Sequence, residues 1–355
     1  MKAARITLAL FGPHGRGAFN EAGLTGALRS RALGHEVEIR WIGPGTPEGR
    51  AEALRDLCRR GVDLLVAHGG QGDAPVQALH AEFPGTTFVV TQGQYTAANV
   101  ACYEVLQEQS AFLAGVFAGL HSRTGVVGHL AGEMMRPGLK GRAAFAQGLR
   151  ASGRSPRLLT HFCGEQHDPA LAYAATLAMQ REGADLVFAM LDGGRAGVSQ
   201  ACRERPIRQI GSVCDWVQRE PDIFVAAAVA DSGRCVAEAI GDFTSGRLRP
   251  GRARLFGLED GTCVHLALPQ SLRSIYGRQL DAWQSRLLDG SLALETDAGQ
   301  EPGRIGVEAV QGMDAAGRGW SMDGLPIAAQ ALADRADQPR SRASTSSSVT
   351  WGNSR

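Results

Sequence analysis

Long apolar runs, lysine and a clustered basic face are scarce in this sequence. The longest apolar runs, such as IFVAAAVA at 223–230, are much shorter than the roughly 20 residues that a membrane-spanning helix needs. Lys2 and Lys140 are the only lysines, and the arginines are spread along the chain among acidic residues, with a formal net charge of +1. We therefore expect no transmembrane segment and no nucleic-acid partner.

Metal-binding and catalytic motifs are also lacking. The seven cysteines form no CxxC pair and are odd in number, which predicts buried free thiols rather than a zinc site or a disulfide framework. The histidines lack metal-ligand spacing, and G-x-S-x-G is absent. No serine lies in a known catalytic motif that would pair it with a general base. The sequence therefore predicts no metal, no cofactor and no catalytic residue.

Short apolar runs alternate with amphipathic stretches from Ile6 to about Ile210 in this chain of 355 residues. Strand, helix and strand at this spacing predict parallel sheets, hence an α/β protein. The apolar runs barely alternate with polar residues, as expected for strands buried on both faces. The length is enough for two lobes. The predicted strands are 6–11, 37–43, 62–68, 87–93, 125–132, 157–162, 184–190 and 207–213.

The strand and helix rhythm is interrupted twice. After residues 87–93 the chain continues through YTAANVACYEV without a crossover helix and enters a long helix at 107–123. Later, the apolar run 223–230 leads directly into a helix at 231–246. Each break is typical of a strand that carries the chain from one lobe to the other. A strand-rich segment at 252–269 and a helix at 271–290 complete the predicted fold, and the helices at 48–60 and 168–183 belong to the regular part.

The loop FGPHGRGAFN follows the first predicted strand, where parallel α/β sheets bind ligands. It lacks the spacing of a P-loop or a dinucleotide fingerprint, so a phosphate cradle is disfavoured. Phe19 and Asn20 offer a ring for stacking and an amide for paired hydrogen bonds, which suits a flat heterocycle. The alternatives are a core role for Phe19 and a helix cap for Asn20. His14 and Arg16 are candidates for further polar contacts, with simple solvation as the alternative.

Four later loops also follow predicted strands and carry candidate ligand-binding residues. In two of them a structural role is the alternative, because charged residues beside a helix start often cap it and a tryptophan at such a position usually belongs to the core. The candidates are Gly69 in AHGGQGD, Gln92 in TQGQY, Asp192, Gly194 and Arg195 in MLDGGRAGVSQ, and Asp215 and Trp216 in CDWVQ.

Several stretches, in order along the chain, resemble the BMP family, the basic membrane lipoprotein or PnrA-like group of ABC-transporter substrate-binding proteins. The similarity covers about residues 4 to 295. It implies a type 1 periplasmic-binding fold, in which two Rossmann-like lobes with parallel sheets are joined by three crossovers and close on a ligand. The stretches that carry it are GPHGRGAFNEAG at 12–23, GVDLLVAHGG at 61–70, FPGTTFVV at 83–90, NVACYEVLQEQSAFLAGVFAGL at 99–120, TGVVGHLAG at 124–132, AFAQGLRA at 144–151, DPALAYAATLAMQREGADLVFAMLDGGRAGV at 168–198 and IGSVCD at 210–215.

This resemblance and the two interruptions together indicate how the chain is divided between the two lobes. We expect lobe 1 to contain 1–104 and 231–258, and lobe 2 to contain 105–230 and 259–296. Residues 297–355 form a C-terminal extension, and the segment from 338 is almost free of apolar residues, which predicts disorder.

The resemblance also implies a ligand, because relatives of PnrA bind purine nucleosides through a Phe and an Asn that correspond to Phe19 and Asn20. Other positions depart from the family pattern. Acidic residues of the family fall at Leu10 and Gln92, and its lysine falls near Ala230. A further family aspartate falls near Val213, leaving Asp215 as the acid of that stretch and Trp216 in place of Gln. These losses favour a free purine-like base or another flat ligand over a nucleoside.

The expected function is therefore that of a solute-binding protein of an ABC-type uptake system, holding a purine base or nucleoside-like ligand between its lobes. An ABC permease and its ATPase are the implied partners. A cytosolic ligand sensor with the same fold is the alternative, and an enzyme acting on nucleosides is a third hypothesis. The family implies a periplasmic or membrane-associated protein. The sequence has no recognisable signal peptide or lipobox cysteine, so a cytoplasmic location stays open.

Overall fold

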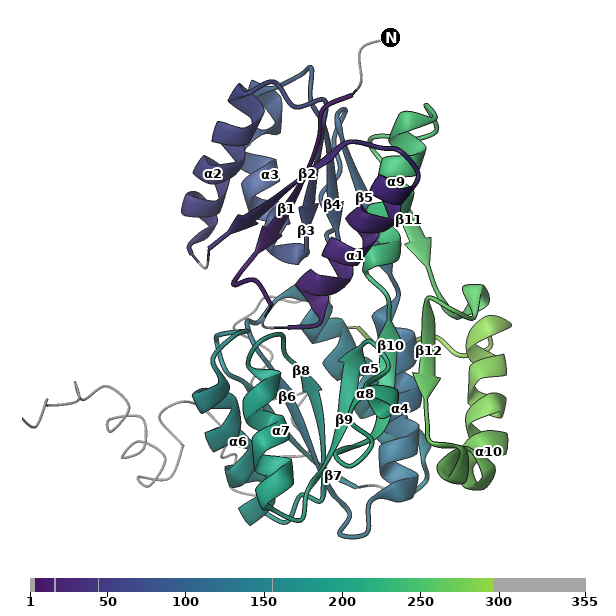
Figure 1. The fold of residues 1–355 in the computed structure, drawn as a ribbon. Helices are drawn as coiled ribbons and strands as arrows, with labels where there is room; N and C mark the ends of the chain where they lie inside the picture. The colour runs from purple at the N-terminus through teal and green to yellow at the C-terminus, as the bar shows by residue number, and fades with distance from the viewer. Residues whose placement is uncertain (1–3, 16, 44, 155, 297–355) are drawn as a thin grey trace, which may run out of the picture.

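The computed structural model describes residues 4–296 except 16, 44 and 155. These residues form two lobes, stacked one above the other in Figure 1, each built on one six-stranded sheet. The predicted C-terminal extension, 297–355, lies outside the described residues.

The sheet of lobe 1 consists of strands that all pair in parallel. In spatial order it contains β11 (Ala253–Phe256), β5 (Val100–Val105), β4 (Thr87–Thr91), β3 (Leu64–His68), β1 (Ile6–Phe11) and β2 (Val37–Ile42). Strands β1, β3 and β5 are buried along their whole length, as expected for mostly apolar strands covered on both faces.

The sheet of lobe 2 differs from the expectation of purely parallel strands at one edge. It contains, in spatial order, β12 (Val264–Ala267), β10 (Phe224–Ala230), β9 (Arg208–Val213), β8 (Leu186–Met190), β6 (Val126–Ala131) and β7 (Arg157–Phe162). Strand β12 pairs antiparallel with β10, whereas the other pairs are parallel. The antiparallel strand arises because the chain enters this sheet from the other lobe rather than through a crossover helix within it.

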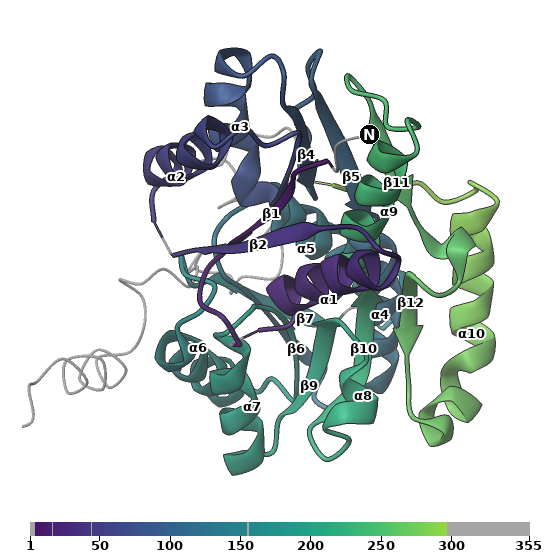
Figure 2. The same ribbon diagram turned by 45° about the horizontal axis from the view of Figure 1, so that its top comes forward.

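Helices cover both faces of the two sheets (Figures 1 and 2). The pair α1 and α9 packs together in lobe 1, and the pair α4 and α5 packs together in lobe 2. The helices are α1 (Phe19–Ala32), α2 (Pro47–Arg59), α3 (Asp73–Leu79), α4 (Gln107–His121), α5 (Arg136–Ala151), α6 (Pro169–Arg181), α7 (Arg195–Glu204), α8 (Trp216–Arg219), α9 (Gly233–Thr244) and α10 (Gln270–Leu288), with short 3-10 turns at η1 (Gly70–Gly72), η2 (His80–Glu82) and η3 (Leu258–Asp260).

The chain passes between the sheets three times. It leaves lobe 1 from β5 into α4, returns from β10 into α9, and crosses again between β11 and β12 through η3. The two interruptions seen in the sequence are the first two of these passages. The fold is therefore the two-lobed architecture with three crossovers that the family resemblance implies.

Helix α4 approaches α5 so closely that glycine is needed on both sides of the contact. A Cβ at Gly115 would lie 2.1 Å from the carbonyl oxygen of Phe145, and a Cβ at Gly148 would lie 2.1 Å from that of Phe112. The small residues in FLAGVFAGL thus allow the backbones to pack, and they place the start of α4 beside the space between the lobes.

All seven cysteines are free, as the sequence predicts, and only Cys214 is partly exposed. Burial raises the pKa of the Cys58 thiol to about 11. Among the described residues, no helix has the length and apolar content to cross a bilayer.

Candidate functional site

A cavity of about 110 Å³ lies between the lobes at the carboxyl ends of the parallel strands. Both lobes contribute to it, which is the arrangement that α/β folds use to bind ligands. Its lining residues from lobe 1 are Phe11, Phe19, Asn20, Gly69, Gly70 and Gln71, and those from lobe 2 are Gln107, Met135, Pro137, Gly138, Gln166, His167, Met190, Leu191, Asp192, Ser212 and Val213. Four of the predicted site residues, Phe19, Asn20, Gly69 and Asp192, are in this set.

The ring of Phe19 is held at the cavity wall by His68, at the end of β3. The two rings are stacked with their centroids 4.3 Å apart and their planes at 21°. His68 Nε2 is 3.0 Å from the Phe19 carbonyl oxygen, and its Nδ1 is 2.9 Å from Thr91 Oγ1. Burial lowers the pKa of His68 to about 4, so the imidazole is neutral at pH 7. A neutral, doubly hydrogen-bonded histidine thus fixes the orientation of Phe19.

Asn20 lies in the first turn of α1 and is buried. Its Nδ2 donates to the Phe11 carbonyl oxygen over 2.7 Å, which ties the helix to the end of β1. The amide oxygen and the second N–H of Asn20 remain for other partners at the cavity. Gly69 faces the same wall, because a Cβ at this position would lie 3.2 Å from the Phe19 ring.

Asp192 comes from lobe 2 but caps a helix of lobe 1. Its Oδ1 accepts hydrogen bonds from the backbone N–H groups of Ala18 and Phe19, over 2.6 and 3.1 Å. These donors belong to the N-terminus of α1, where a carboxylate is electrostatically favoured. A Cβ at Gly17 would lie 1.4 Å from Asp192 Oδ1, so this approach requires glycine. Asp192 is only 6% exposed, and burial raises its pKa.

Residues missed by sequence reasoning form much of the lobe 2 wall. They include two glutamines, Gln107 and Gln166, and the imidazole of His167, whose Nδ1 accepts a hydrogen bond from the Gly193 backbone N–H over 3.4 Å. Gln107 begins the helix that follows β5, and Gln166 and His167 follow β7. Their position after a strand is the signal that could have identified them, because it is the same rule that selected Phe19 and Asn20.

A buried ion cluster lies next to Gln107 at the first passage between the lobes. Lys140 Nζ is 2.7 Å from Glu104 Oε1 and 2.5 Å from Glu108 Oε1. Arg136 Nη1 is 2.9 Å from the same Glu104 oxygen. Glu104 lies in β5 of lobe 1, whereas the other three residues belong to lobe 2, so the cluster joins the lobes beside the cavity.

Gln92, which the sequence predicts as a ligand contact, is not among the residues that line the cavity. Its Oε1 accepts from the Val105 backbone N–H over 2.7 Å, and its Nε2 donates to the Val105 carbonyl oxygen over 3.1 Å. Both ends of the amide are therefore used to hold the end of β5. The residue adopts a positive φ of 57°, which turns the chain after β4 and directs the side chain toward β5.

Trp216 and Arg195 form a packed stack away from the cavity. The Trp216 ring is 5% exposed, lies 5.4 Å from the Phe224 ring and donates from Nε1 to the Ser212 carbonyl oxygen over 2.9 Å. The Arg195 guanidinium carbon lies 3.5 Å from the Trp216 ring centroid. The core alternative for Trp216 is thus the observed one.

The remaining predicted residues are likewise outside the cavity. Asp215 caps the short helix α8 by accepting from the Gln218 backbone N–H, and Gly194 packs on the backbone of the loop before α6. His14 is exposed, with its ring 4.6 Å from that of Trp41. Arg16 lies outside the described residues.

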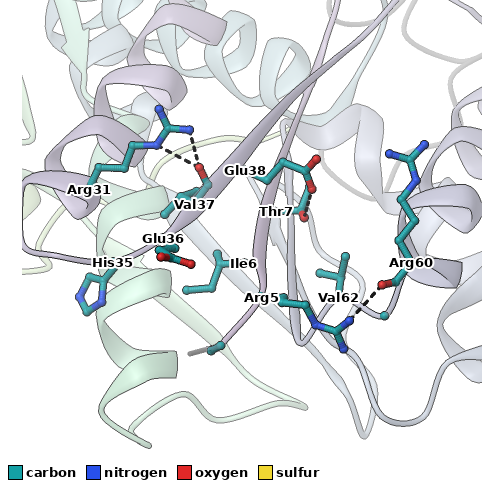
Figure 3. Close-up of a pocket in the computed structure, with 12 residues that line it drawn as sticks. Arg5, Ile6, Thr7, Arg31, His35, Glu36, Val37, Glu38, Arg60 and Val62 are labelled. Carbon is teal, nitrogen blue, oxygen red and sulfur yellow. Dashed lines mark hydrogen bonds between the residues drawn. The ribbon is translucent and has the colours of Figure 1, made fainter. Parts of the chain in front are cut away.

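A larger hollow of about 490 Å³ lies at the opposite edge of the lobe 1 sheet (Figure 3). It surrounds the amino ends of β1 and β2, where parallel sheets do not usually bind ligands. Its arginines bond to backbone carbonyls, with Arg31 on Val37 and Arg5 on Arg60, as the dashed lines in Figure 3 mark. The interlobe cavity is therefore the better candidate. No cluster of potential metal ligands occurs within the described part of the chain.

Two lobes with mostly parallel sheets that enclose a cavity lined from both sides are characteristic of the type 1 periplasmic-binding fold. The chain belongs to the family of PnrA-like ABC-transporter substrate-binding proteins, whose model matches residues 19–290. This family consists of substrate-binding proteins rather than enzymes.

Individual relatives are distant. The chain is 25% identical over 209 residues to the transcriptional activator protein Med of Bacillus subtilis, covering 59% of this chain and 65% of the relative. It is 23% identical over 203 residues to a purine-binding protein of Brucella abortus, covering 57% of each. The chain thus spans less than two thirds of either relative. A solute-binding protein of an ABC transporter system from Aeropyrum pernix has a TM-score of 0.73 at 20% identity, over 83% of this chain and 94% of that one.

Proposed function

We propose that the chain binds a purine base or a closely similar flat heterocycle in the interlobe cavity. The observation that carries this proposal is the ring of Phe19, which lines the cavity and is backed by His68 at 4.3 Å. A ring that is fixed on one side and borders a cavity is suited to stacking on a flat ligand. Apolar side chains of lobe 2, among them Met190 and Leu191, line the same cavity.

The polar edges of the bound heterocycle would contact a small set of fixed groups. Asn20 offers an amide oxygen and an N–H, and Asp192 offers a carboxylate that is held by the N-terminus of α1. Gln107 and Gln166 add amides from lobe 2. Amides and a carboxylate match the mixed donors and acceptors on the edge of a purine. The name of the Brucella relative, a purine-binding protein, favours the same ligand class.

In this proposal the protein delivers its ligand to an ABC permease and ATPase and works outside the cytoplasmic membrane. The lobes, which we place at 1–104 with 231–258 and at 105–230 with 259–296, would close on the ligand by hinge motion. Closure matters because residues from both lobes surround the cavity, and contact from both sides excludes water.

A thermal-shift screen with purine bases, nucleosides, sugars and amino acids tests the ligand class. A ligand that binds only the folded state stabilises it by about 2.7 kcal/mol at a concentration of 100 Kd. We expect purine bases to raise the melting temperature. If only a sugar or an amino acid raises it, the proposed ligand class is wrong.

A second candidate function is a ligand sensor, and the resemblance to Med, named as a transcriptional activator, favours it. The two functions predict different partners. Ligand-loaded transport protein should stimulate the ATPase activity of a reconstituted permease complex, whereas a sensor should leave it unchanged and bind a regulatory partner in a ligand-dependent way.

A further inference from the structure

We propose that Lys140 clamps the first passage between the lobes and thereby positions one wall of the interlobe cavity, an inference whose effect on binding rests on the proposed function. The first passage is the short stretch that leads from β5 of lobe 1 into α4 of lobe 2. Lys140 lies in α5, the helix whose first turn borders the cavity. It is one of only two lysines in the chain.

Lys140 contacts one carboxylate on each side of the first passage. Its Nζ is 2.7 Å from Oε1 of Glu104, which lies in β5, and 2.5 Å from Oε1 of Glu108, which lies in the first turn of α4. Arg136 also binds Glu104, but in the described part of the chain no ion pair joins it to Glu108. Lys140 is therefore the cation that holds the strand and the helix together across the passage. We refer to Lys140 and these two carboxylates as the clamp.

The clamp is buried, and stability alone does not explain it. The three side chains are only 5 to 8% exposed. Burial raises the pKa of Glu108, and the ammonium group of Lys140 opposes this rise. Glu108 Oε2 has no hydrogen-bond partner among the described residues, and such an unpaired oxygen is costly. Apolar side chains of similar volume are often at least as stable as a buried ion pair, so we assign the clamp a geometric role.

The backbone of the first passage carries hydrogen bonds that report on bending. The Leu106 N–H donates to the Phe256 carbonyl oxygen over 2.8 Å, and the Gln109 N–H donates to the Leu106 carbonyl oxygen over 3.0 Å. Phe256 ends β11, so the first of these bonds ties the first passage to the start of the third. A change in the angle between the lobes bends the connecting segments. The clamp restrains this bending because it holds both ends of the first passage.

The clamp acts on the cavity through Gln107 and the start of α5. Gln107 is the first residue of α4 and lines the cavity, and its Nε2 donates to the Pro137 carbonyl oxygen over 2.6 Å. Pro137 and Gly138 line the same wall and precede Lys140 by less than one helical turn. The first passage and α5 thus build one wall together. Lys140 is not among the lining residues, so it is a positioning residue rather than a ligand contact.

Hydrogen–deuterium exchange on the full chain tests the clamp without any ligand. The variant combines Lys140→Met with Glu108→Met, which removes both partners together and leaves Glu104 paired with Arg136. Replacing both members of a buried pair with apolar groups is often nearly neutral for stability. We therefore expect an unchanged midpoint of chemical denaturation. The amides at 106–109 should exchange at least about tenfold faster, because a lost hydrogen bond to a charged group is worth that factor.

A control variant and a second test variant accompany this experiment. Arg150→Met is the matched control, because Arg150 lies in the last turn of α5 and pairs with Glu295 where both side chains are 58% exposed. It should leave exchange at 106–109 within about twofold of that in the parent chain. Glu108→Gln keeps the side-chain volume and removes only the charge on the α4 side. It should also speed exchange at 106–109, and it tests the clamp if the double variant does not fold.

Isothermal titration calorimetry with adenine and guanosine measures the consequence for binding. The apparent dissociation constant of a ligand rises as the fraction of molecules with a competent site falls. We expect the double variant to bind either probe about three- to tenfold more weakly, although neither replaced residue lines the cavity. Arg150→Met should bind both probes like the parent chain.

The outcomes separate the clamp from the proposed function. If the amides at 106–109 exchange at the parent rate in both test variants, or if all protected amides exchange faster together because global stability has fallen, the clamp is refuted. If exchange at 106–109 rises but a probe that binds the parent chain binds the double variant equally well, Lys140 does not position the cavity wall. If neither adenine nor guanosine binds the parent chain, the proposed function fails, while the exchange rates still decide whether the clamp exists.

Discussion

At the scale of single side chains, the two aromatic candidates differ in what covers their faces. Phe19 has His68 on one side and borders the cavity, whereas Trp216 lies between Arg195 and Phe224. Only a ring that borders the cavity can stack on a ligand. We therefore expect Phe19 to contribute to ligand recognition and Trp216 to stability.

Replacing Phe19 with alanine should weaken ligand binding by about 1 to 3 kcal/mol, the range for loss of a stacking aromatic. Calorimetry with the best purine from the thermal screen measures this. Trp216→Phe is the control: it should lower stability through lost core packing and leave affinity unchanged. An affinity for Phe19→Ala equal to that of the parent chain would remove the stacking role.

A second residue-scale prediction concerns acid stability. The pKa of His68 is lowered to about 4 by burial, whereas an unfolded histidine titrates near 6.5. As the pH falls from 6.5 to 4, His68 becomes protonated in the unfolded chain but stays mostly neutral in the folded protein. The contribution of His68 to the free energy of unfolding is therefore fully present above pH 6.5. It is lost as the pH falls through this window, which lowers the free energy of unfolding by at most about 3 kcal/mol. His129, with a pKa lowered to about 3, acts in the same direction.

Melting temperatures between pH 7.5 and 4.5 measure this decline. His68→Gln should make the decline shallower, because one of the buried imidazoles with a lowered pKa is gone. An identical slope in the variant would show that His68 does not contribute.

The strand-end rule selects residues that the structure places at the cavity and others that it does not. Phe19, Asn20, Gly69 and Asp192 line the cavity, and their role in binding stays a prediction. Gln92 does not line it, because an amide at a strand end can bond either to a ligand or to the neighbouring strand. Which of these partners an amide takes depends on the backbone path, here a residue with φ of 57°, and no local pattern encodes that choice.

At the scale of elements, close helix packing decides which glycines are required. Gly115→Ala should destabilise the fold by about 1 to 3 kcal/mol, because its Cβ would meet the Phe145 carbonyl oxygen at 2.1 Å. Gly241→Ala in α9 is the matched control, since a Cβ there meets no atom within 4 Å. It should be neutral or stabilise by up to about 1 kcal/mol. Chemical denaturation measures both, and equal effects would contradict the packing argument.

Most elements were predictable because their patterns are local. The helix predicted at 107–123 is observed at Gln107–His121, and that at 271–290 at Gln270–Leu288. The strand-rich segment 252–269 forms β11 and β12 in different sheets. Its local pattern shows only that it is rich in strands. The lobe boundary at 258 was predicted with the help of the family resemblance, because a crossing between lobes is a property of the tertiary fold.

At the scale of the whole molecule, carboxylates from both lobes form contacts between them, including Glu104 of lobe 1 and two carboxylates of lobe 2. Asp192 accepts from the N-terminus of α1, and Glu133 contacts Arg50 and Gln71. These contacts are lost when the lobes separate. The two-lobed fold could be predicted from the interruptions in the strand rhythm, but these carboxylate contacts could not, because they join residues far apart in the chain.

Asp192→Ala should therefore shift the ligand-free protein toward an open form. Each hydrogen bond to a charged group contributes roughly 1.5 to 3 kcal/mol, which is enough to change the populations of open and closed lobes. Small-angle X-ray scattering should record a larger radius of gyration for the variant without ligand. Asp215→Ala is the matched control, because Asp215 caps α8 within lobe 2 alone. If both variants scatter like the parent chain, Asp192 does not determine how far the lobes close.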